Sequence, residues 1–129
     1  MMHSKSVVIE KESGRLGGMD KYKIGLYEKA MKNTLSWKEK LQCAKECGYD
    51  YLEISIDATD EKINRIFMDK EEQKEIMEAV FETEIPIGSM SVSALTKYAL
   101  GDPSETVREK AMQIAGKSIE LASVLGVRT

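Results

Sequence analysis

The chain has 129 residues, of which 42% are hydrophobic and 32% are charged, and its formal net charge at pH 7 is −3. This length suits one modest domain with its own core, and the composition excludes an intrinsically disordered chain. The slight acidic excess argues against a dedicated nucleic-acid-binding protein, which would normally carry a basic excess.

Signals for membranes, secretion and zinc are missing from the sequence. No apolar run approaches the roughly 20 residues of a membrane-spanning helix, and the N-terminus lacks the apolar core of a secretory signal. We therefore expect a cytoplasmic protein. Cys43 and Cys47, with His3 as the one histidine, are too few for a zinc site. We expect both cysteines to be small packing residues in a reducing compartment.

The first structural unit is expected to follow a flexible tail. Residues 1–20 are polar and glycine-containing, so we assign them no chemistry and place the domain at residues 21–129. Tyr22–Tyr27 is predicted to be a short strand. Ser36 and Glu39 have the spacing of a capping box at a helix start, and Gly48 is typical of a helix end. The helix between them carries apolar residues at helical spacing, namely Trp37, Leu41, Ala44 and Cys47.

The second unit begins with a strand at Tyr49–Ile56 that alternates in part. Tyr51 and Glu53 are predicted to face one side of it, and Leu52, Ile54 and Ile56 the other. A short helical stretch at Asp60–Ile66 follows. Asp69 and Glu72 then indicate the start of a longer helix. Its predicted apolar face consists of Ile76, Met77, Val80 and Phe81, and its acidic stretch from Asp69 to Glu75 is expected to be solvated.

The third unit begins with a strand at Ile85–Ser91, where Pro86 is tolerated near the strand start. Asp102 as N-cap and Pro103 as first helical residue predict the start of a long helix that ends at Gly126. Its apolar positions are Val107, Ala111, Ile114, Leu121 and Leu125. Residues 127–129 are predicted to open a fourth strand.

Strands that alternate with helices predict a parallel α/β sheet with right-handed crossovers. Two closures remain open from this pattern, an open doubly wound sheet or part of a closed β/α barrel. A complete barrel takes about 250 residues, so this chain would supply about half of one.

Standard catalytic motifs are absent from the sequence: it has no G-x-G-x-x-G, no Walker loop and no Ser-His-Asp set. Polar residues instead gather where the predicted strands end, the edge at which β/α folds bind ligands. They are Tyr27, Glu28 and Lys29; Glu53, Ser55 and Asp57; and Ser89, Ser91 and Ser93. Hydroxyls, carboxylates and a lysine suit a polyhydroxylated small molecule, phosphorylated or not.

Each of these residues also has a structural interpretation. A carboxylate such as Glu53 inside an apolar strand is costly unless paired, which favours a functional role. Lys29 is more simply a solvated surface lysine. The serines equally suit a role in satisfying backbone groups at strand ends.

Three segments together resemble a known family. They are Gly25–Ala30 (GLYEKA), Glu53–Asp57 (EISID) running into Thr59–Arg65 (TDEKINR), and Ser89–Ala94 (SMSVSA) followed by Leu100-Gly101. In this order they resemble the L-ribulose-5-phosphate (L-xylulose-5-phosphate) 3-epimerases, within the xylose-isomerase-like barrels. The resemblance runs from about Tyr22 to the last residue. It implies a partial (β/α)8 TIM barrel comprising the first three βα units and the start of strand four.

The resemblance also implies a chemistry. In this isomerase family a divalent metal, manganese or zinc, polarises the ketone, and two glutamates move protons through an enediolate on a pentose-phosphate substrate of sugar or ascorbate catabolism. The metal ligands and both glutamates come from strands after the third. We therefore expect no catalytic or metal residue, and no activity, in this chain alone. The resemblance implies substrate contacts at Tyr27, Glu53, Ser91, Ser93 and Arg65.

Two departures leave the substrate open. After Ser93 the family has a histidine and basic residues, whereas here only Lys97 is basic in the corresponding stretch. The family's tryptophan after Arg65 is replaced by Phe67-Met68. Either change bears on which sugar phosphate would fit.

Two other functions are compatible with the sequence. The chain would be a non-catalytic half-barrel, a remnant or an assembly module, whose open sheet edges favour homodimers or aggregation. A nucleic-acid repair enzyme of the same superfamily is disfavoured by the acidic balance. The expected partner is a small sugar phosphate, without nucleic acid or membrane.

Overall fold

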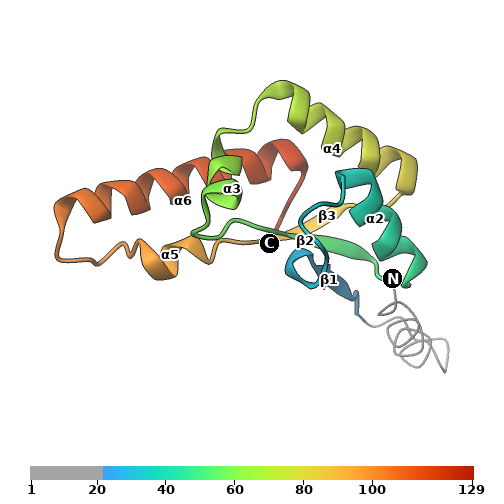
Figure 1. The fold of residues 1–129 in the computed structure, drawn as a ribbon, viewed down its shortest axis with the longest axis horizontal. Helices are drawn as coiled ribbons and strands as arrows, with labels where there is room; N and C mark the ends of the chain where they lie inside the picture. The colour runs from blue at the N-terminus through green and yellow to red at the C-terminus, as the bar shows by residue number, and fades with distance from the viewer. Residues whose placement is uncertain (1–21) are drawn as a thin grey trace.

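The computed structural model describes residues 22–129 and contains three parallel strands in the order β1-β2-β3. They are β1 (Gly25–Tyr27), β2 (Tyr51–Ser55) and β3 (Ile87–Ser91). The helices α2, α4 and α6 lie on one side of this open sheet (Figure 1). The parallel α/β architecture predicted from sequence is confirmed. The predicted tail lies outside the described residues.

The helical segments connect the strands as the sequence pattern indicated. Their bounds are η1 (Glu28–Ala30), α2 (Trp37–Glu46), α3 (Asp60–Ile63), η2 (Asn64–Phe67), α4 (Lys70–Thr83), α5 (Ala94–Lys97) and α6 (Glu105–Leu125). Both predicted capping boxes are confirmed, at Ser36 with Glu39 and at Asp69 with Glu72. Gly126 has a φ of 74°, a left-handed conformation that glycine adopts without a Cβ penalty, and it ends α6 as predicted.

The predicted start of α6 is wrong by a few residues. Asp102 was expected to be the N-cap, but Ser104 is, and its Oγ accepts a hydrogen bond from the Val107 N–H. The Asp102 carboxylate instead accepts a 2.8 Å hydrogen bond from the Ser104 N–H, which forms a turn ahead of the helix. Pro103 therefore lies within that turn and not at the first helical position.

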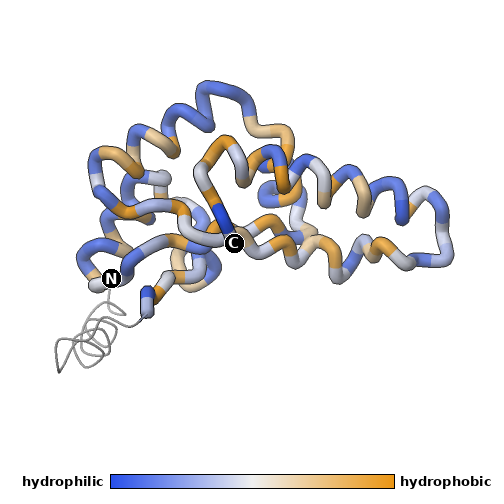
Figure 2. Tube along the Cα trace, turned by 180° about the vertical axis from the view of Figure 1, so that it is seen from behind, coloured by the Kyte–Doolittle hydropathy of each residue, from blue (hydrophilic) through white to orange (hydrophobic). Residues whose placement is uncertain are grey.

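The two faces of the sheet differ in polarity as predicted. Leu52, Ile54 and Ile56 are fully buried toward the helices, whereas Tyr51 and Glu53 are half-buried on the opposite face. The core also takes in Leu41, Ala44, Ile76, Ala79, Ile87, Ile114, Leu121 and Leu125. Hydrophobic and hydrophilic segments accordingly alternate along α4 and α6 (Figure 2). The core therefore sits between one sheet face and the helices.

The predicted apolar face of α4 is wrong at two positions. Ile76 is buried, as predicted, but Met77 and Phe81 are 39% and 86% exposed. Met77 directly follows Ile76 and is turned from it by about 100° around the helix axis. Phe81 lies four residues after Met77, on the same face as Met77, so both leave the buried stripe. Ala79 takes the core position instead.

The end of the chain lies against β3. The Met90 N–H donates a 2.9 Å hydrogen bond to the Thr129 carbonyl. The segment predicted to open a fourth strand therefore lies where such a strand would pair, although residues 127–129 are not themselves a strand. Within residues 22–129, no helix is long and apolar enough to cross a membrane.

Tyr51 lies over two glycines on the open face of the sheet. A Cβ atom placed on Gly88 would lie 2.5 Å from the Tyr51 Cγ, and one on Gly25 would also collide with the Tyr51 ring. The pairing of β2 with β3 shifts register at this point, from Leu52 opposite Ile87 to Glu53 opposite Ser89, so Gly88 is the extra residue of a bulge. The ring requires glycine beneath it.

We predict that Gly88→Ala lowers the free energy of unfolding by about 1–3 kcal/mol, because the new methyl group must displace the ring. In a Tyr51→Ala background most of this cost should disappear. Gly116→Ala is the matched control, because Gly116 lies in α6 with open space around it and should gain about 1 kcal/mol. Urea denaturation followed by circular dichroism measures the unmodified chain, the three single variants and the double variant. An equal cost of Gly88→Ala with and without the Tyr51 ring would contradict this account.

Candidate functional site

Hydroxyl groups from all three strands meet at the carboxyl edge of the sheet. The Tyr27 hydroxyl lies 3.4 Å from the Ser55 Oγ and 3.4 Å from the Ser91 Oγ. Each of these residues is the last of its strand. Because parallel strands end at one edge, residues distant in sequence come together there. We call Tyr27, Ser55 and Ser91 the hydroxyl cluster. It brings together two of the predicted substrate contacts, Tyr27 and Ser91.

Glu53 and Ser93 lie beside this cluster. Glu53 is paired in register with Tyr27 on β1 and with Ser89 on β3, and its carboxylate accepts a 2.6 Å hydrogen bond from the Ser89 hydroxyl. Ser93 is half-buried, two residues beyond Ser91, and precedes α5 without a side-chain capping bond. The substrate contacts predicted for Glu53 and Ser93 stay predictions.

The deeply buried carboxylate at this edge belongs to Glu28, which directly follows Tyr27. Glu28 is 1% exposed, and its carboxylate accepts hydrogen bonds from Lys40 Nζ at 2.7 Å and from the Ser55 N–H at 2.9 Å. Arg65 donates to both carboxylate oxygens, with Nη1 and Nη2 each at 2.6 Å. Three elements besides η1 thus converge on one carboxylate.

Arg65 is held inside the protein on every side. Besides Glu28, its Nη1 donates to the Ser55 carbonyl at 2.9 Å. Its guanidinium lies 4.9 Å from the centre of the Trp37 ring, and Lys40 Nζ lies 4.6 Å from the same ring. We call Glu28, Arg65, Lys40 and Trp37 the Glu28 network. The substrate contact predicted for Arg65 stays a prediction, and its Nη1 and Nη2 both have protein partners.

The Glu28 network changes the acidity of its central group. Burial raises the pKa of Glu28, but hydrogen bonds from Arg65 and Lys40 outweigh it and lower the pKa from 4.5 to about 2. The carboxylate is therefore ionised at neutral pH and has no proton to exchange. Its role at this edge is to bind the cationic side chains of Lys40 and Arg65 and the backbone N–H of Ser55.

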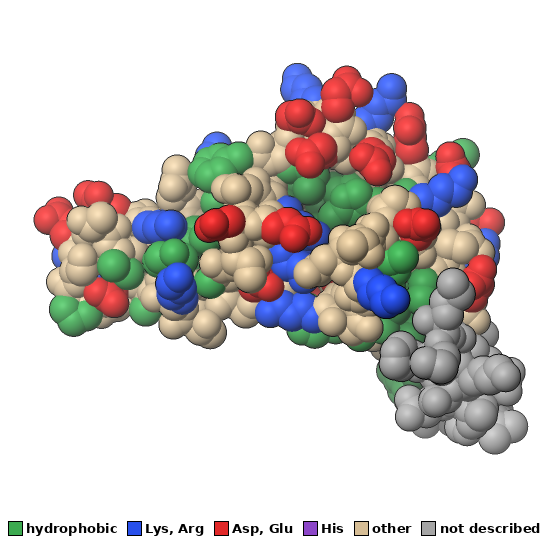
Figure 3. Space-filling view, in the orientation of Figure 1, with side chains coloured by type: hydrophobic (Ala, Val, Ile, Leu, Met, Phe, Trp, Pro, Cys, Tyr) green, Lys and Arg blue, Asp and Glu red, His purple; other side chains and the backbone are tan. Residues whose placement is uncertain are grey.

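A second ion pair forms the rim of the edge. Lys29 Nζ lies 3.2 Å from Asp57 Oδ2, and Asp57 also accepts hydrogen bonds from the Thr59 side chain and N–H. Burial raises the pKa of Asp57, but the Thr59 hydrogen bonds and Lys29 hold it at about 2. On the face of the molecule that Figure 3 shows, Lys and Arg side chains lie among Asp and Glu side chains over the middle. Lys29, 40% exposed, thus has a defined partner.

The sequence predicted that Glu53 is the carboxylate whose burial costs free energy. In the structure Glu53 is half-buried, and the deeply buried carboxylate is Glu28. The signal that could have found it lies in α2, where Lys40 occupies the same helical stripe as Trp37, Leu41 and Ala44. A lysine in a buried stripe requires a carboxylate partner. The pattern does not say which of several acids supplies it.

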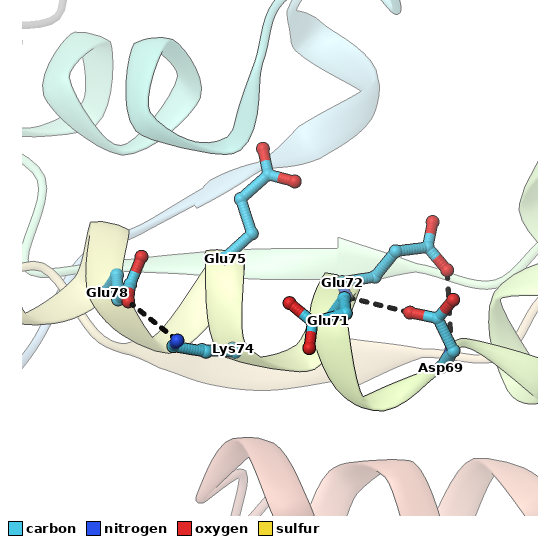
Figure 4. A pocket seen from close by; sticks show the side chains of 6 residues that line it. All are labelled: Asp69, Glu71, Glu72, Lys74, Glu75 and Glu78. Atoms are coloured by element: carbon cyan, nitrogen blue, oxygen red, sulfur yellow. Dashed lines mark hydrogen bonds and ion pairs between the residues drawn. The ribbon is translucent and has the colours of Figure 1, made fainter.

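The described residues do not fit a divalent metal. Within residues 22–129 no three His, Cys, Asp or Glu side chains lie close enough together to hold one. Glu28 already accepts bonds from two cations, which excludes it as a metal ligand. The acidic side chains along α4 spread into solvent, with Asp69 bonded to Glu72 and Lys74 near Glu78 (Figure 4). They form the solvated face expected from sequence.

Comparison with known proteins identifies similar chains. Residues 41–129 match the family described as the xylose isomerase-like TIM barrel. A protein of Escherichia coli K12 with the provisional name L-ribulose-5-phosphate 3-epimerase SgbU is 41% identical over 111 residues, covering 86% of this chain and 39% of the relative. L-ribulose-5-phosphate 3-epimerase UlaE of Escherichia coli O139:H28 is 36% identical over 105 residues, covering 81% and 37%. The chain thus spans about two fifths of these relatives.

We predict that Glu28 makes the free energy of unfolding decrease as the pH falls below 4.5. Its pKa is lower in the folded chain than in the unfolded one, so its stabilisation is complete above pH 4.5 and is lost as the pH falls toward 2. The shift corresponds to about 3 kcal/mol of unfolding free energy. Glu28→Gln should be less stable at pH 7 and should lose less stability than the unmodified chain between pH 5 and pH 2. Parallel curves for the two proteins in urea denaturation at each pH would contradict this role.

Proposed function

We propose, because this chain belongs to the xylose isomerase-like TIM barrel family, that it supplies substrate-binding groups to a sugar-phosphate 3-epimerase. The reaction would interconvert L-ribulose 5-phosphate and L-xylulose 5-phosphate by inverting carbon 3. The observation that carries the proposal is the 41% identity, over 86% of this chain, with a relative named for that substrate. The protein would act in the cytoplasm, where phosphorylated sugars are metabolised.

The hydroxyl cluster supports this assignment through its chemistry. Tyr27, Ser55 and Ser91 each donate and accept hydrogen bonds, which matches the donor and acceptor character of sugar hydroxyls. The Tyr27 hydroxyl lies 3.4 Å from each serine oxygen, which exceeds the usual 2.7–2.8 Å for hydroxyl pairs, so the half-buried Tyr27 and Ser91 would retain capacity for a ligand. Glu53 and Ser93 would accept or donate further bonds from either side of the cluster.

Proton transfer and metal binding would belong to other segments of a protein as long as the relatives. Within residues 22–129 no three His, Cys, Asp or Glu side chains are grouped to hold a metal ion, and the deeply buried carboxylate of Glu28 is held ionised by cations. In such an enzyme a manganese or zinc ion would stabilise negative charge on the substrate. This chain's contribution would be to bind and orient the sugar.

A half-barrel assembly module is the second candidate function. Met112 and Ile119 on α6 are 65% and 71% exposed, which leaves apolar surface beside the open sheet. A partner half-barrel, or a second copy in a homodimer, would cover it. Analytical ultracentrifugation separates the candidates, because a module without substrate binding would self-associate regardless of sugar phosphate.

We predict that the 129-residue chain binds L-ribulose 5-phosphate but does not epimerise it with manganese or zinc present. Tyr27→Phe removes one hydroxyl from the cluster and should weaken binding about tenfold. Tyr22→Phe, at a tyrosine that is 59% exposed, is the matched control and should bind normally. Isothermal titration calorimetry measures affinity, and an assay of L-xylulose 5-phosphate formation measures turnover. Absence of binding would contradict the substrate site, and robust turnover would contradict the assignment of catalysis to other segments.

A further inference from the structure

We propose that Glu28 and Arg65 are positioning residues that fix the ends of β1 and β2, so that the buried Ser55 holds the Tyr27 hydroxyl toward the substrate. This inference rests on the proposed function, because it assigns roles within the same site. It gives Arg65 a role different from direct contact with the sugar or its phosphate. The two residues would act on the ligand through the backbone of Ser55 and the position of Tyr27.

The end of β2 extends beyond its partner strand. β1 pairs with β2 only as far as Tyr27 opposite Glu53, and Ser55 lies two residues further along. The Ser55 N–H donates to Glu28 Oε2 at 2.9 Å, and the Ser55 carbonyl accepts from Arg65 Nη1 at 2.9 Å. The side chains of Glu28 and Arg65 thus take the place that the next residues of β1 would occupy. Both backbone groups of Ser55 are satisfied by this one ion pair.

The same ion pair also fixes β1. Glu28 follows Tyr27 directly, so a displacement of the Glu28 carboxylate moves the Tyr27 backbone as well. Ser55 is fully buried and its Oγ lies 3.4 Å from the Tyr27 hydroxyl. Two of the three members of the hydroxyl cluster are therefore located by Glu28. Ser91 is located separately, by the pairing of β3 with β2.

Both terminal nitrogens of Arg65 have partners within the protein. Its side chain is 10% exposed, Nη1 serves both Glu28 and Ser55, Nη2 serves Glu28, and the guanidinium plane lies near Trp37. A bidentate arginine–carboxylate pair has a defined geometry that lysine cannot reproduce. Arg65→Lys would keep the charge but lose the second bond, which loosens Ser55.

Ligand comparison separates positioning from direct contact. We expect Glu28→Gln and Arg65→Lys each to weaken binding of L-ribulose 5-phosphate and of unphosphorylated L-ribulose by the same factor, about tenfold. The ratio of the two affinities should stay unchanged, because the phosphate is not what these residues touch. A loss confined to the phosphorylated sugar in Arg65→Lys would overturn the proposal. Glu82→Gln, which breaks the exposed Lys38–Glu82 pair, is the matched control and should bind normally.

A measurement without ligand tests the positioning of Tyr27 and Ser55 separately from sugar binding. Burial raises the pKa of Tyr27, but hydrogen bonds with Ser55 and Ser91 and the charge of Lys29 lower it below its ordinary value. In folded Glu28→Gln or Arg65→Lys the tyrosine should titrate closer to that ordinary value, and the Ser55 amide proton should shift, both followed by NMR. An unchanged Tyr27 titration with an unchanged Ser55 amide would overturn the proposal.

Sugar binding and the positioning role of Glu28 and Arg65 can fail separately. If the unmodified chain binds neither sugar, the proposed function fails, and the Tyr27 titration still decides the positioning role. If Glu28→Gln does not fold, Arg65→Lys carries the test, and Lys40→Met is its comparison, because it removes one cation and keeps the Glu28–Arg65 pair. Lys40→Met should leave the Tyr27 titration and the Ser55 amide close to those of the unmodified chain. A change as large as that in Arg65→Lys would overturn the assignment to Glu28 and Arg65.

Discussion

The carboxyl edge of this sheet depends on the buried carboxylate of Glu28. It joins the end of β1, the Lys40 side chain of α2, the end of β2 and the Arg65 side chain of η2 at distances of 2.6–2.9 Å. Removing such a carboxylate would leave two buried cations without a counter-ion, which is more costly than losing the bonds themselves. The segments it joins come from residues as far as 37 positions apart.

The two faces of the sheet carry different kinds of side chain. One face carries Leu52 and Ile54 against the helices, and the other carries Tyr51 and Glu53 with the hydroxyl cluster at its end. Because side chains alternate along a strand, the same five-residue segment supplies side chains to both faces. The Glu28 network lies at the junction, where the strands end and loops begin. In that position one ion pair would influence both stability and the proposed ligand site.

Local signals in the sequence predicted the elements well, and long-range pairing was the part they could not supply. Capping boxes at Ser36 and Asp69 were readable because their partners are three residues away. The role of Glu28 was not, because its partners Lys40, Ser55 and Arg65 are fixed by the fold. The start of α6 was misplaced because Asp102 and Ser104 are both good capping residues, and only the turn geometry distinguishes them. The hydrophobic character of Met77 and Phe81 suggested a core position, but their angular position around the helix axis turns both toward solvent.

Membership of the xylose isomerase-like TIM barrel family and the meeting of Tyr27, Ser55 and Ser91 at one edge lead to a single central claim: this edge binds a sugar phosphate. The most direct test is to map amide chemical-shift changes across the chain during titration with L-ribulose 5-phosphate. The account predicts that the saturable changes centre on the ends of β1, β2 and β3, with Ser55 and Ser91 among the largest. Changes centred on α4 or on the exposed face of α6, with the strand ends unaffected, would contradict it.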